Sequence, residues 1–293
     1  MKFRAHETFS IRKGWLHKGM RQIINNPRVF VDKGKNPMDE FGLGSNMVKS
    51  LRYWLQATGL AVEEISGSSR EQTLTEFGKI VWENDPYLEE DGTLLLIHYL
   101  LCTNKELATA WYFFFNVYKM VDITQESFVS AIKTYLLNEK KQQVSDRALN
   151  DDFDCIIKTY LQSGNIISPE SNMECPLSEL GLLEFSDKKK KIYAKRSPHQ
   201  VTVNPLIILA VIIRENAKEN GISEIKISKL EDDPCNIGRV FNLDSLAVAY
   251  FLDRLQNMGL LKVNRTAGLN LVTLHTDWTF GECVERYYES IND

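Results

Sequence analysis

The sequence predicts a mainly α-helical α+β protein in which winged helix-turn-helix units with short β-hairpins surround a helical core. Apolar residues recur at helical spacing along most of the chain, and short alternating segments come in pairs after several helices. No segment alternates strands and helices at the spacing of βαβ units, so the strands are expected in local hairpins and not in a parallel sheet.

Length and composition are those of a globular protein. At roughly 100–200 residues per domain, the 293 residues predict two to three domains. A hydrophobic fraction of 43% with 25% charged residues argues against intrinsic disorder. The two longest apolar runs, Pro205–Ile213 and Ala110–Phe115, fall short of the roughly 18 residues of a membrane span and predict buried helices.

Cysteine usage and the start of the sequence predict a cytoplasmic location. The five cysteines are far apart and form no C-x-x-C pair, which makes a zinc ribbon or a thioredoxin-type redox site improbable. Isolated thiols in a chain of this size fit a reducing compartment. The first residues contain no apolar stretch of signal-peptide length, and no membrane partner is expected.

The first helix is predicted at Ile11–Asn25, with Ser10 as its N-cap and Pro27 marking its end. One face of this helix is apolar. Another face carries Lys13, His17 and Arg21 at four-residue spacing, with Lys18 beside them. A loop is expected at Asp32–Gly44.

The second helix is predicted at Ser45–Gln56 and ends before Gly59. Four of its side chains are expected to face the core: Val48, Leu51, Leu55 and Thr58. Five are expected to face outward: Asn46, Lys49, Arg52, Tyr53 and Gln56. Strands are predicted at Leu60–Ile65 and Gln72–Leu74 around a turn at Ser66–Ser69, with a further helix at Thr75–Trp82.

The sequence LQATGL at 55–60, which joins the second predicted helix to its hairpin, is similar to LQNMGL at 255–260. The second copy also lies between a predicted helix and a predicted hairpin. Here the helix is predicted at Leu243–Met258, with Leu246, Tyr250, Leu252 and Leu255 as core candidates. Its strands are expected at Leu260–Asn264 and Leu269–Leu274, around a turn at 266–268. A weaker copy spans Pro176–Ala194, with Lys188–Lys191 at the hairpin tip. Chance could also produce the match, because helix-to-strand junctions favour Gly followed by Leu.

The remaining helices are predicted from apolar periodicity at Thr93–Cys102, Leu107–Tyr118, Thr124–Leu137, Ser145–Gln162 and Asn204–Asn220. Thr279 and Glu282 form a capping box that opens a last helix, Thr279–Ile291.

Positive charge is concentrated near the N-terminus. Residues 1–56 contain 11 Lys and Arg against four Asp and Glu, a net +7, while the rest of the chain carries −11. A segment of this kind attracts a polyanion even when the whole protein is acidic. We therefore predict a basic winged-helix DNA-binding domain at 1–85, a helical core with a hairpin at 86–197 and a second winged-helix-like domain at 198–293.

The outward face of the second helix is chemically suited to DNA. Lys49 and Arg52 can bind phosphate or guanine, Gln56 can pair with adenine, and Tyr53 can stack or bond to phosphate. Exposed helices commonly carry these residue types without binding DNA. The acids Asp151, Asp152 and Asp154 are predicted to form a solvated helix face.

Candidate catalytic chemistry rests on the adjacent pair His6 and Glu7. The sequence contains no Walker loop, no Gly-x-Ser-x-Gly elbow and no His-Glu-x-x-His motif. A His beside a carboxylate can act as a general base or hold a metal-bound water, with Asp39 or Glu40 as further ligands. The alternative, which we favour from the residues alone, is structural: Glu7 pairs with an Arg, and His6 bonds to a backbone carbonyl.

Three blocks carry a resemblance to a known bacterial family: HETFSIRKGWLHKG at His6–Gly19, FGLGSNMVKSLRYWLQATGL at Phe41–Leu60, and PLSELGLL at Pro176–Leu183. In these the chain resembles the SspB-like family, long labelled only as of unknown function. Its genes lie in defence islands beside ATPases and proteins similar to phosphoadenosine-phosphosulfate reductase. In the SspB branch, the protein nicks DNA in a single-stranded phosphorothioation system.

The resemblance implies a DNA-binding protein that cuts one strand so that sulfur can be inserted, with the reductase-like protein and the ATPase as partners and Mg²⁺ or Mn²⁺ as cofactor. It identifies no catalytic residue and no metal ligand. We assign catalysis to His6 and Glu7, because they lie beside the basic helix, with Arg12 and Lys13 neutralising the scissile phosphate. The predicted DNA-binding residues are Arg12, Lys13, Lys18, Arg21, Lys49, Arg52, Tyr53 and Gln56.

Two other functions stay open. The chain could be a non-catalytic winged-helix adaptor that recruits modification enzymes to DNA, or a scaffold that binds proteins through its acidic remainder.

Overall fold

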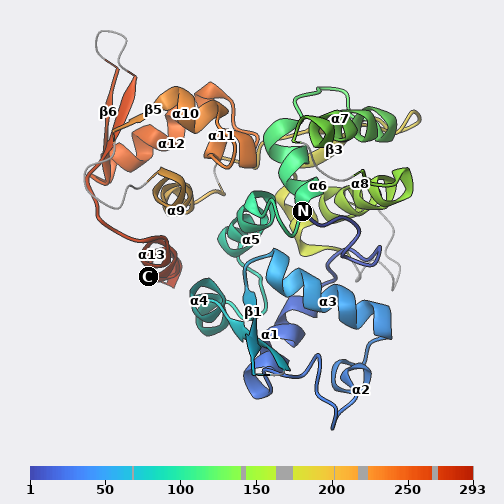
Figure 1. Cartoon of the computed structure of the whole chain (residues 1–293). Helices are drawn as coiled ribbons and strands as arrows, with labels where there is room; N and C mark the ends of the chain where they lie inside the picture. The colour runs from blue at the N-terminus through green and yellow to red at the C-terminus, as the bar shows by residue number, and fades with distance from the viewer. Residues whose placement is uncertain are drawn as a thin grey trace.

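The structure, a computed structural model, describes residues 1–67, 69–139, 143–162, 174–200, 202–216, 224–265 and 270–292. It is mostly helical, with small sheets of two, two and three strands (Figure 1). Every strand pair among the described residues is antiparallel. The predicted α+β class is confirmed.

The N-terminal region contains α1 (Trp15–Asn25), α2 (Pro37–Phe41), α3 (Ser45–Ala57), β1 (Ala61–Ser66), β2 (Ser69–Leu74) and α4 (Glu76–Asn84). Helix α1 begins later than predicted, because Gly14 adopts a left-handed φ of 78° just before it, and Ser10 is not its cap. Helix α2 lies inside the predicted loop. Its start has two ordinary signals, since the Asn36 side chain accepts a hydrogen bond from the Met38 N–H and Pro37 occupies the first turn.

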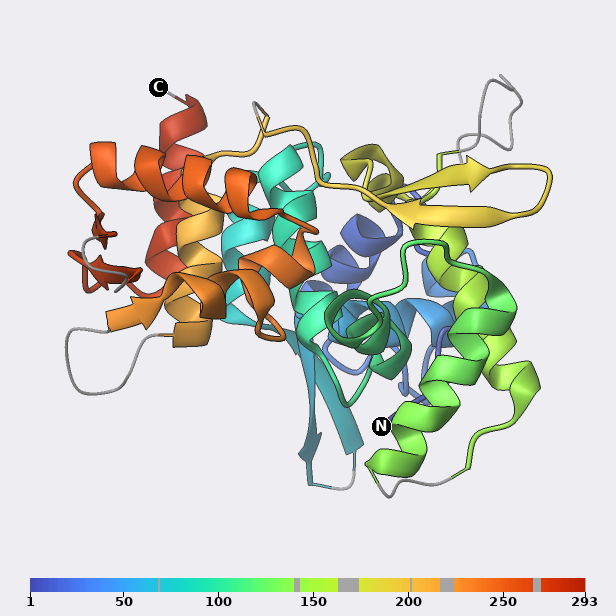
Figure 2. The ribbon, with the colours of Figure 1, turned by 90° about the horizontal axis from the view of Figure 1, so that it is seen from above.

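The middle region contains α5 (Asp91–Thr103), α6 (Thr109–Tyr112), the π-helix η1 (Phe113–Val117), α7 (Gln125–Asn138), α8 (Asp146–Tyr160), the 3₁₀-helix η3 (Pro176–Leu180), β3 (Leu183–Asp187) and β4 (Ile192–Lys195). Helix α5 is buried from Gly92 to Cys102 and forms the centre of the molecule. The predicted helix at Leu107–Tyr118 is divided between α6 and η1. The β1–β2 and β3–β4 hairpins project from the body in different directions (Figure 2).

The C-terminal region contains α9 (Pro205–Asn216), β5 (Glu224–Lys226), α10 (Ile227–Asp232), α11 (Ile237–Val240), α12 (Ser245–Asn257), β6 (Leu261–Asn264), β7 (Leu271–Leu274) and α13 (Phe280–Asn292). The sequence did not suggest β5, which pairs with β7 and gives the sheet order β5–β7–β6. The end of the predicted helix Asn204–Asn220 and the predicted turn at 266–268 lie outside the described residues.

Two of the four core candidates on α12 are wrong. Leu252 and Leu255 are buried, but Leu246 is 81% exposed and Tyr250 is 38% exposed. The helix turns Val248, Leu252 and Leu255 toward the core at four- and three-residue spacing, which leaves Leu246 and Tyr250 on the opposite face.

The repeated sequence pattern corresponds to a repeated local structure. Helices α3 and α12 each contain 13 residues, and each is followed by a left-handed glycine, Gly59 at a φ of 71° or Gly259 at 75°. An antiparallel hairpin then follows in both places. Glycine suits this position because a side chain disfavours positive φ. The assignment of these units as winged helices stays a prediction.

The last helix joins the C-terminal region to the rest of the chain. Helix α13 packs against α9 and α4 (Figure 1). The Gly92 N–H donates to the Tyr287 hydroxyl at 3.2 Å, so α13 also contacts the start of α5. The predicted capping box is confirmed by reciprocal bonds between Thr279 and Glu282. The buried apolar side chains form one core cluster across all three regions. None of the described helices is long and apolar enough to span a membrane.

Candidate nucleic-acid interface

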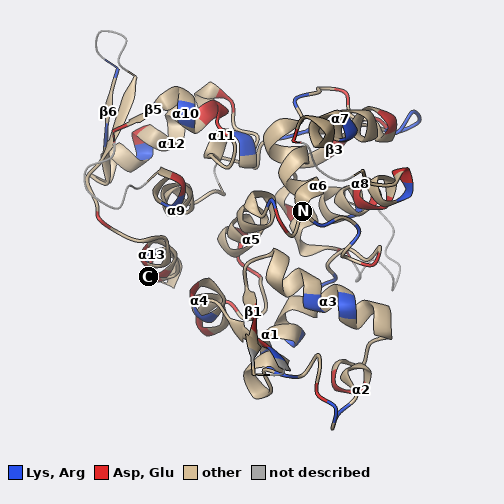
Figure 3. Ribbon diagram, viewed as in Figure 1, with Lys and Arg blue, Asp and Glu red and all other residues tan. Residues whose placement is uncertain are grey.

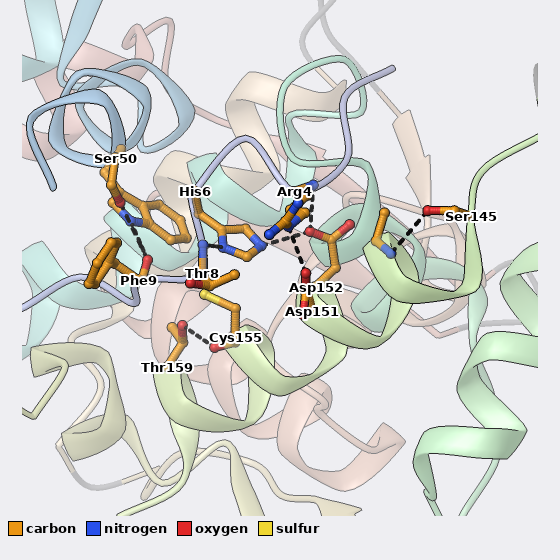
Figure 4. A network of polar contacts seen from close by, with 12 residues as sticks. Arg4, His6, Thr8, Phe9, Ser50, Ser145, Asp151, Asp152, Cys155 and Thr159 are labelled. Carbon is orange, nitrogen blue, oxygen red and sulfur yellow. Dashed lines mark hydrogen bonds and ion pairs between the residues drawn. The ribbon is translucent and has the colours of Figure 1, made fainter. Parts of the chain in front are cut away.

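Hydrogen bonds and an ion pair hold the segment before α1 against α8 (Figure 4). The Arg4 backbone N–H donates to Asp152 Oδ1 at 2.8 Å, and the Arg4 Nε lies 2.6 Å from Asp151 Oδ2. Three residues here have a positive φ although none is glycine: Arg4 at 55°, Glu7 at 50° and Thr8 at 67°. Such conformations cost about 1–3 kcal/mol each and persist only where surrounding contacts hold them.

His6 makes the central hydrogen bond between this segment and α8. The Thr8 N–H donates to His6 Nδ1 at 3.1 Å, which fixes the lone pair on Nδ1 and the proton on Nε2. The Nε2–H then donates to Asp152 Oδ1 at 2.7 Å. The ring is fully buried and stacks on Trp54 with 6.1 Å between centroids. Both ring nitrogens are therefore committed inside the protein, and His6 bonds to a carboxylate where a carbonyl was expected.

The three acids of α8 do not form the solvated face that the sequence predicted. Asp152 is only 1% exposed, and burial raises the pKa of its carboxyl group against the opposing effect of the His6 hydrogen bond. Asp151 pairs with Arg4, while exposed Asp154 accepts a bond from the Gln125 side chain at 3.0 Å. The prediction failed for Asp152 because its partner is 146 residues away in the sequence.

The acids considered for a metal site do not come together. The Glu7 side chain forms no ion pair with a described residue, Asp39 is exposed, and Glu40 lies 3.5 Å from Lys35. Throughout the part of the chain that the structure describes, no three His, Cys, Asp or Glu side chains are grouped as metal ligands. The described residues therefore do not form a site for the divalent cation implied by the resemblance, and we derive no chemical step through one.

Four predicted DNA-binding residues lie on or just before α1: Arg12, Lys13, Lys18 and Arg21, which we call the α1 cations. None of them forms an ion pair with a described carboxylate. The Arg12 guanidinium lies over the Phe9 and Trp15 rings, at 5.6 and 5.3 Å from their centroids. The Lys18 Nζ donates to the Phe41 carbonyl at 3.0 Å. The charges of this group are left available to an external anion.

The four predicted residues of α3 are arranged differently. Lys49 is exposed and bonds to the Asn46 side chain at 3.3 Å. Arg52 pairs with Glu63 of β1 at 2.7 Å, and the Gln56 side chain donates to the Arg52 carbonyl. Tyr53 was expected to face outward but is only 8% exposed. The N-terminal segment covers this side of α3, as the His6 contact with Trp54 shows.

The cationic character of the N-terminal segment is thus retained in the folded chain, although only in part. Of the eleven Lys and Arg in residues 1–56, seven form no ion pair with a described residue: Lys2, Arg12, Lys13, Lys18, Arg21, Lys33 and Lys49. The other four pair with acids. Figure 3 marks Lys and Arg in blue, and such positions are seen on α3 and around α1 and α2.

One feature of this face was not anticipated. His17 of α1 lies between two aromatic rings, 4.4 Å from the Tyr87 centroid and 5.4 Å from the Trp82 centroid, each at 20°. The His17 Nδ1–H donates to the Pro86 carbonyl at 2.9 Å, which holds the ring in place. Spacing had placed His17 on the face of Lys13 and Arg21, but no local pattern connects it with Tyr87, 70 positions later.

Two crystal structures of SspB are similar to this chain. The magnesium ion-bound SspB structure matches with a TM-score of 0.87 at 24% identity, covering 100% of this chain and 89% of that one. A second SspB structure matches with a TM-score of 0.84 at 25% identity and the same coverage. The SspB-like fold thus extends over the whole chain.

Comparison at the level of sequence gives the family. No curated protein matches the chain. The model of the family described as "Protein of unknown function (DUF4007)" matches residues 3–288, almost the entire length. The chain therefore belongs to the DUF4007 family.

Proposed function

We propose that this chain is a DNA-binding component of a bacterial DNA phosphorothioation system and that the α1 cations bind the phosphate backbone. The observation that carries the proposal is the absence of ion pairs at Arg12, Lys13, Lys18 and Arg21 among the described residues, while Arg52 nearby is neutralised by Glu63. Phosphate contacts by unpaired Lys and Arg supply most sequence-independent affinity for DNA. The placement in phosphorothioation rests on the resemblance to SspB.

The arrangement of helices and strands supports the same proposal. The C-terminal region runs α9–β5–α10–α11–α12–β6–β7 with sheet order β5–β7–β6, an order that supports its assignment as a winged helix. The N-terminal region has the corresponding helices and hairpin but only two strands in its sheet. We assign both as winged-helix units. Helix-turn-helix folds of this kind commonly contact DNA through a helix and its flanking backbone.

The test is removal of charge from α1. Lys13→Ala combined with Arg21→Ala should weaken binding to a short DNA duplex by about tenfold or more at low salt, since two phosphate contacts are lost. Lys188→Ala combined with Lys189→Ala removes the same charge from the β3–β4 turn and serves as the matched control. Fluorescence anisotropy measures both. Equal loss in the two double variants would show only a response to net charge and would remove the assignment to α1.

A second candidate function is strand nicking, and two observations favour it: the resemblance to a DNA-nicking branch and the similarity to an SspB structure with magnesium ion bound. The dispersed acids and the buried His6 favour the non-catalytic adaptor instead. Relaxation of supercoiled plasmid with Mg²⁺ or Mn²⁺, abolished by a chelator, distinguishes the two. Glu7→Ala tests the assigned residue, because normal nicking by this variant would exclude Glu7 from catalysis.

We also propose that the chain binds two partner proteins of the same system. The resemblance implies a protein similar to phosphoadenosine-phosphosulfate reductase and an ATPase. Co-purification of each with the full chain, with and without a DNA duplex, tests whether the chain recruits them to DNA.

A further inference from the structure

A small cavity opens at the start of α1. Its volume is about 240 Å³, and its lining includes Arg12, Lys13, Tyr87, Glu89 and Glu179. Pockets that enclose drug-sized ligands measure roughly 300–1,000 Å³, so this cavity suits one small planar group at the end of a longer ligand.

The aromatic wall of the cavity is held rigid from behind. Tyr87 is 63% exposed although its ring packs on His17 at 4.4 Å. His17 in turn packs on Trp82 and bonds to the Pro86 carbonyl. The Trp82, His17 and Tyr87 rings lie in series, with 20° between the planes of each neighbouring pair, and the exposed Tyr87 ring is at the solvent end. A fixed and uncovered aromatic face is the usual platform for stacking an unpaired nucleobase.

Positive charge lies at the same cavity. Arg12 is held by its contacts with the Phe9 and Trp15 rings and, like Lys13, forms no ion pair with a described residue. A guanidinium positioned by aromatic contacts keeps its hydrogen-bond donors free for a phosphate. An aromatic platform beside unpaired cations matches the combination by which proteins bind single-stranded nucleic acid.

The two carboxylates of the cavity, Glu89 and Glu179, are both exposed. Carboxylates repel phosphate but accept hydrogen bonds from the exocyclic amino group of a base, as in contacts with cytosine N4. The cavity lining therefore supplies both cations for a phosphate and carboxylates for the amino edge of a base. Thymine has no such amino group and is the least suited to it.

We infer that this cavity binds one unpaired nucleotide of a single DNA strand, with its base stacked on Tyr87, its amino edge toward Glu89 and Glu179, and a neighbouring phosphate on Arg12 and Lys13. The inference rests on the proposed function and deepens it, because it specifies single-stranded or extruded nucleotides as the ligand.

The experiment compares binding of a labelled oligodeoxycytidine, an oligodeoxythymidine and a DNA duplex to the full chain. Wild type should bind oligodeoxycytidine more tightly than oligodeoxythymidine. Tyr87→Ala should weaken oligodeoxycytidine binding by about tenfold, which is the size expected for loss of one base–aromatic stack, and should leave duplex binding within about twofold. Tyr87→Phe keeps the ring and should bind like wild type.

Tyr250→Ala is the matched control, since Tyr250 is another exposed tyrosine with an arginine nearby, Arg254, at 5.7 Å from its ring. It should leave oligodeoxycytidine binding unchanged. Unaltered binding by Tyr87→Ala, or equal losses in the Tyr87 and Tyr250 variants, would overturn the inference. Equal or tighter binding of oligodeoxythymidine would overturn the role given to the carboxylates.

Binding of duplex DNA distinguishes failure of the single-strand inference from failure of the proposed function. If Tyr87→Ala binds both ligands like wild type, only the single-strand site is wrong. If wild type binds neither single strands nor duplex, the DNA-binding proposal itself fails.

Discussion

The two helix–hairpin units of this chain share a sequence pattern, a helix length and a glycine turn, yet they present different surfaces. In the N-terminal unit, the segment held by His6 covers the outer side of α3 and buries Tyr53. In the C-terminal unit α12 is less covered, since Tyr250, at the position that matches the buried Ser50 of α3, is 38% exposed. The local pattern determines the helix and the hairpin, whereas a segment from elsewhere in the chain determines which face remains open.

The charges differ too. Residues 1–56 carry a net +7, and the α1 cations are free of ion pairs with described residues, whereas in the C-terminal unit Arg265 pairs with Asp253 at 3.0 Å. We therefore propose that DNA binds to the N-terminal unit. The following predictions test this contrast.

The largest expected effect is the loss of stability when the His6 hydrogen bonds are removed. His6→Ala should lower the free energy of unfolding by about 3 kcal/mol, because Asp152 and the Thr8 N–H lose a buried partner. Thermal unfolding should shift down by roughly 5–10 °C. His275→Ala changes an exposed histidine of the C-terminal unit and should shift it by less than about 2 °C. Equal shifts would show that the N-terminal segment is not specially held.

Acid should lower the free energy of unfolding through a second buried histidine, His98, which bonds α5 to α11. His98 Nε2–H donates to the Val240 carbonyl at 2.8 Å, and burial lowers the His98 pKa to about 4 from an ordinary 6.5. Below pH 6.5 the unfolded chain binds the proton more readily, so this stability is complete above 6.5 and is lost as the pH falls toward 4. Between pH 6.5 and 4.5 the loss should be about 2–3 kcal/mol.

Chemical denaturation at several pH values measures that loss. The variant His98→Gln should be less stable than wild type at neutral pH but less sensitive to acid over the same interval. An identical pH dependence in the two proteins would contradict the assignment to His98.

A smaller effect is expected from releasing the neutralised arginine of α3. Glu63→Gln removes the ion pair with Arg52 and should strengthen duplex binding about twofold to fivefold, because one more cation faces DNA. The matched change Glu184→Gln releases Arg196 of the β3–β4 hairpin and should have no such effect. If both variants gain the same duplex affinity, the position of the released arginine relative to α1 does not matter.

The smallest effect is predicted on the open face of α12. Leu246→Ser should change the free energy of unfolding by less than about 0.5 kcal/mol, since the side chain is already in solvent. Val248→Ala, two positions away and fully buried, should cost about 1–3 kcal/mol. Urea denaturation of both variants checks whether the helix is oriented as described.

The sequence predicted those parts of the fold that local chemistry controls. Glycine after a helix identified both hairpins, and Thr279 with Glu282 identified the start of α13. The failures are tertiary. The partner of Asp152 and the segment that covers Tyr53 come from distant parts of the chain, so helical spacing placed both side chains in solvent.

The candidate site was predicted to a similar extent. Charge counting located the α1 cations, but it could not show that Arg52 is neutralised by a strand eleven residues later. No local pattern connects Tyr87 with His17, because that contact depends on how the segment after α4 packs against α1.

The dependence of duplex affinity on salt tests the central claim most directly. If the four α1 cations contact phosphate, the logarithm of the affinity should fall with the logarithm of the salt concentration with a slope of about 3 to 4. In the Lys13→Ala, Arg21→Ala double variant the slope should decrease by about 2. A flat dependence in wild type, or an unchanged slope in the variant, would contradict the account.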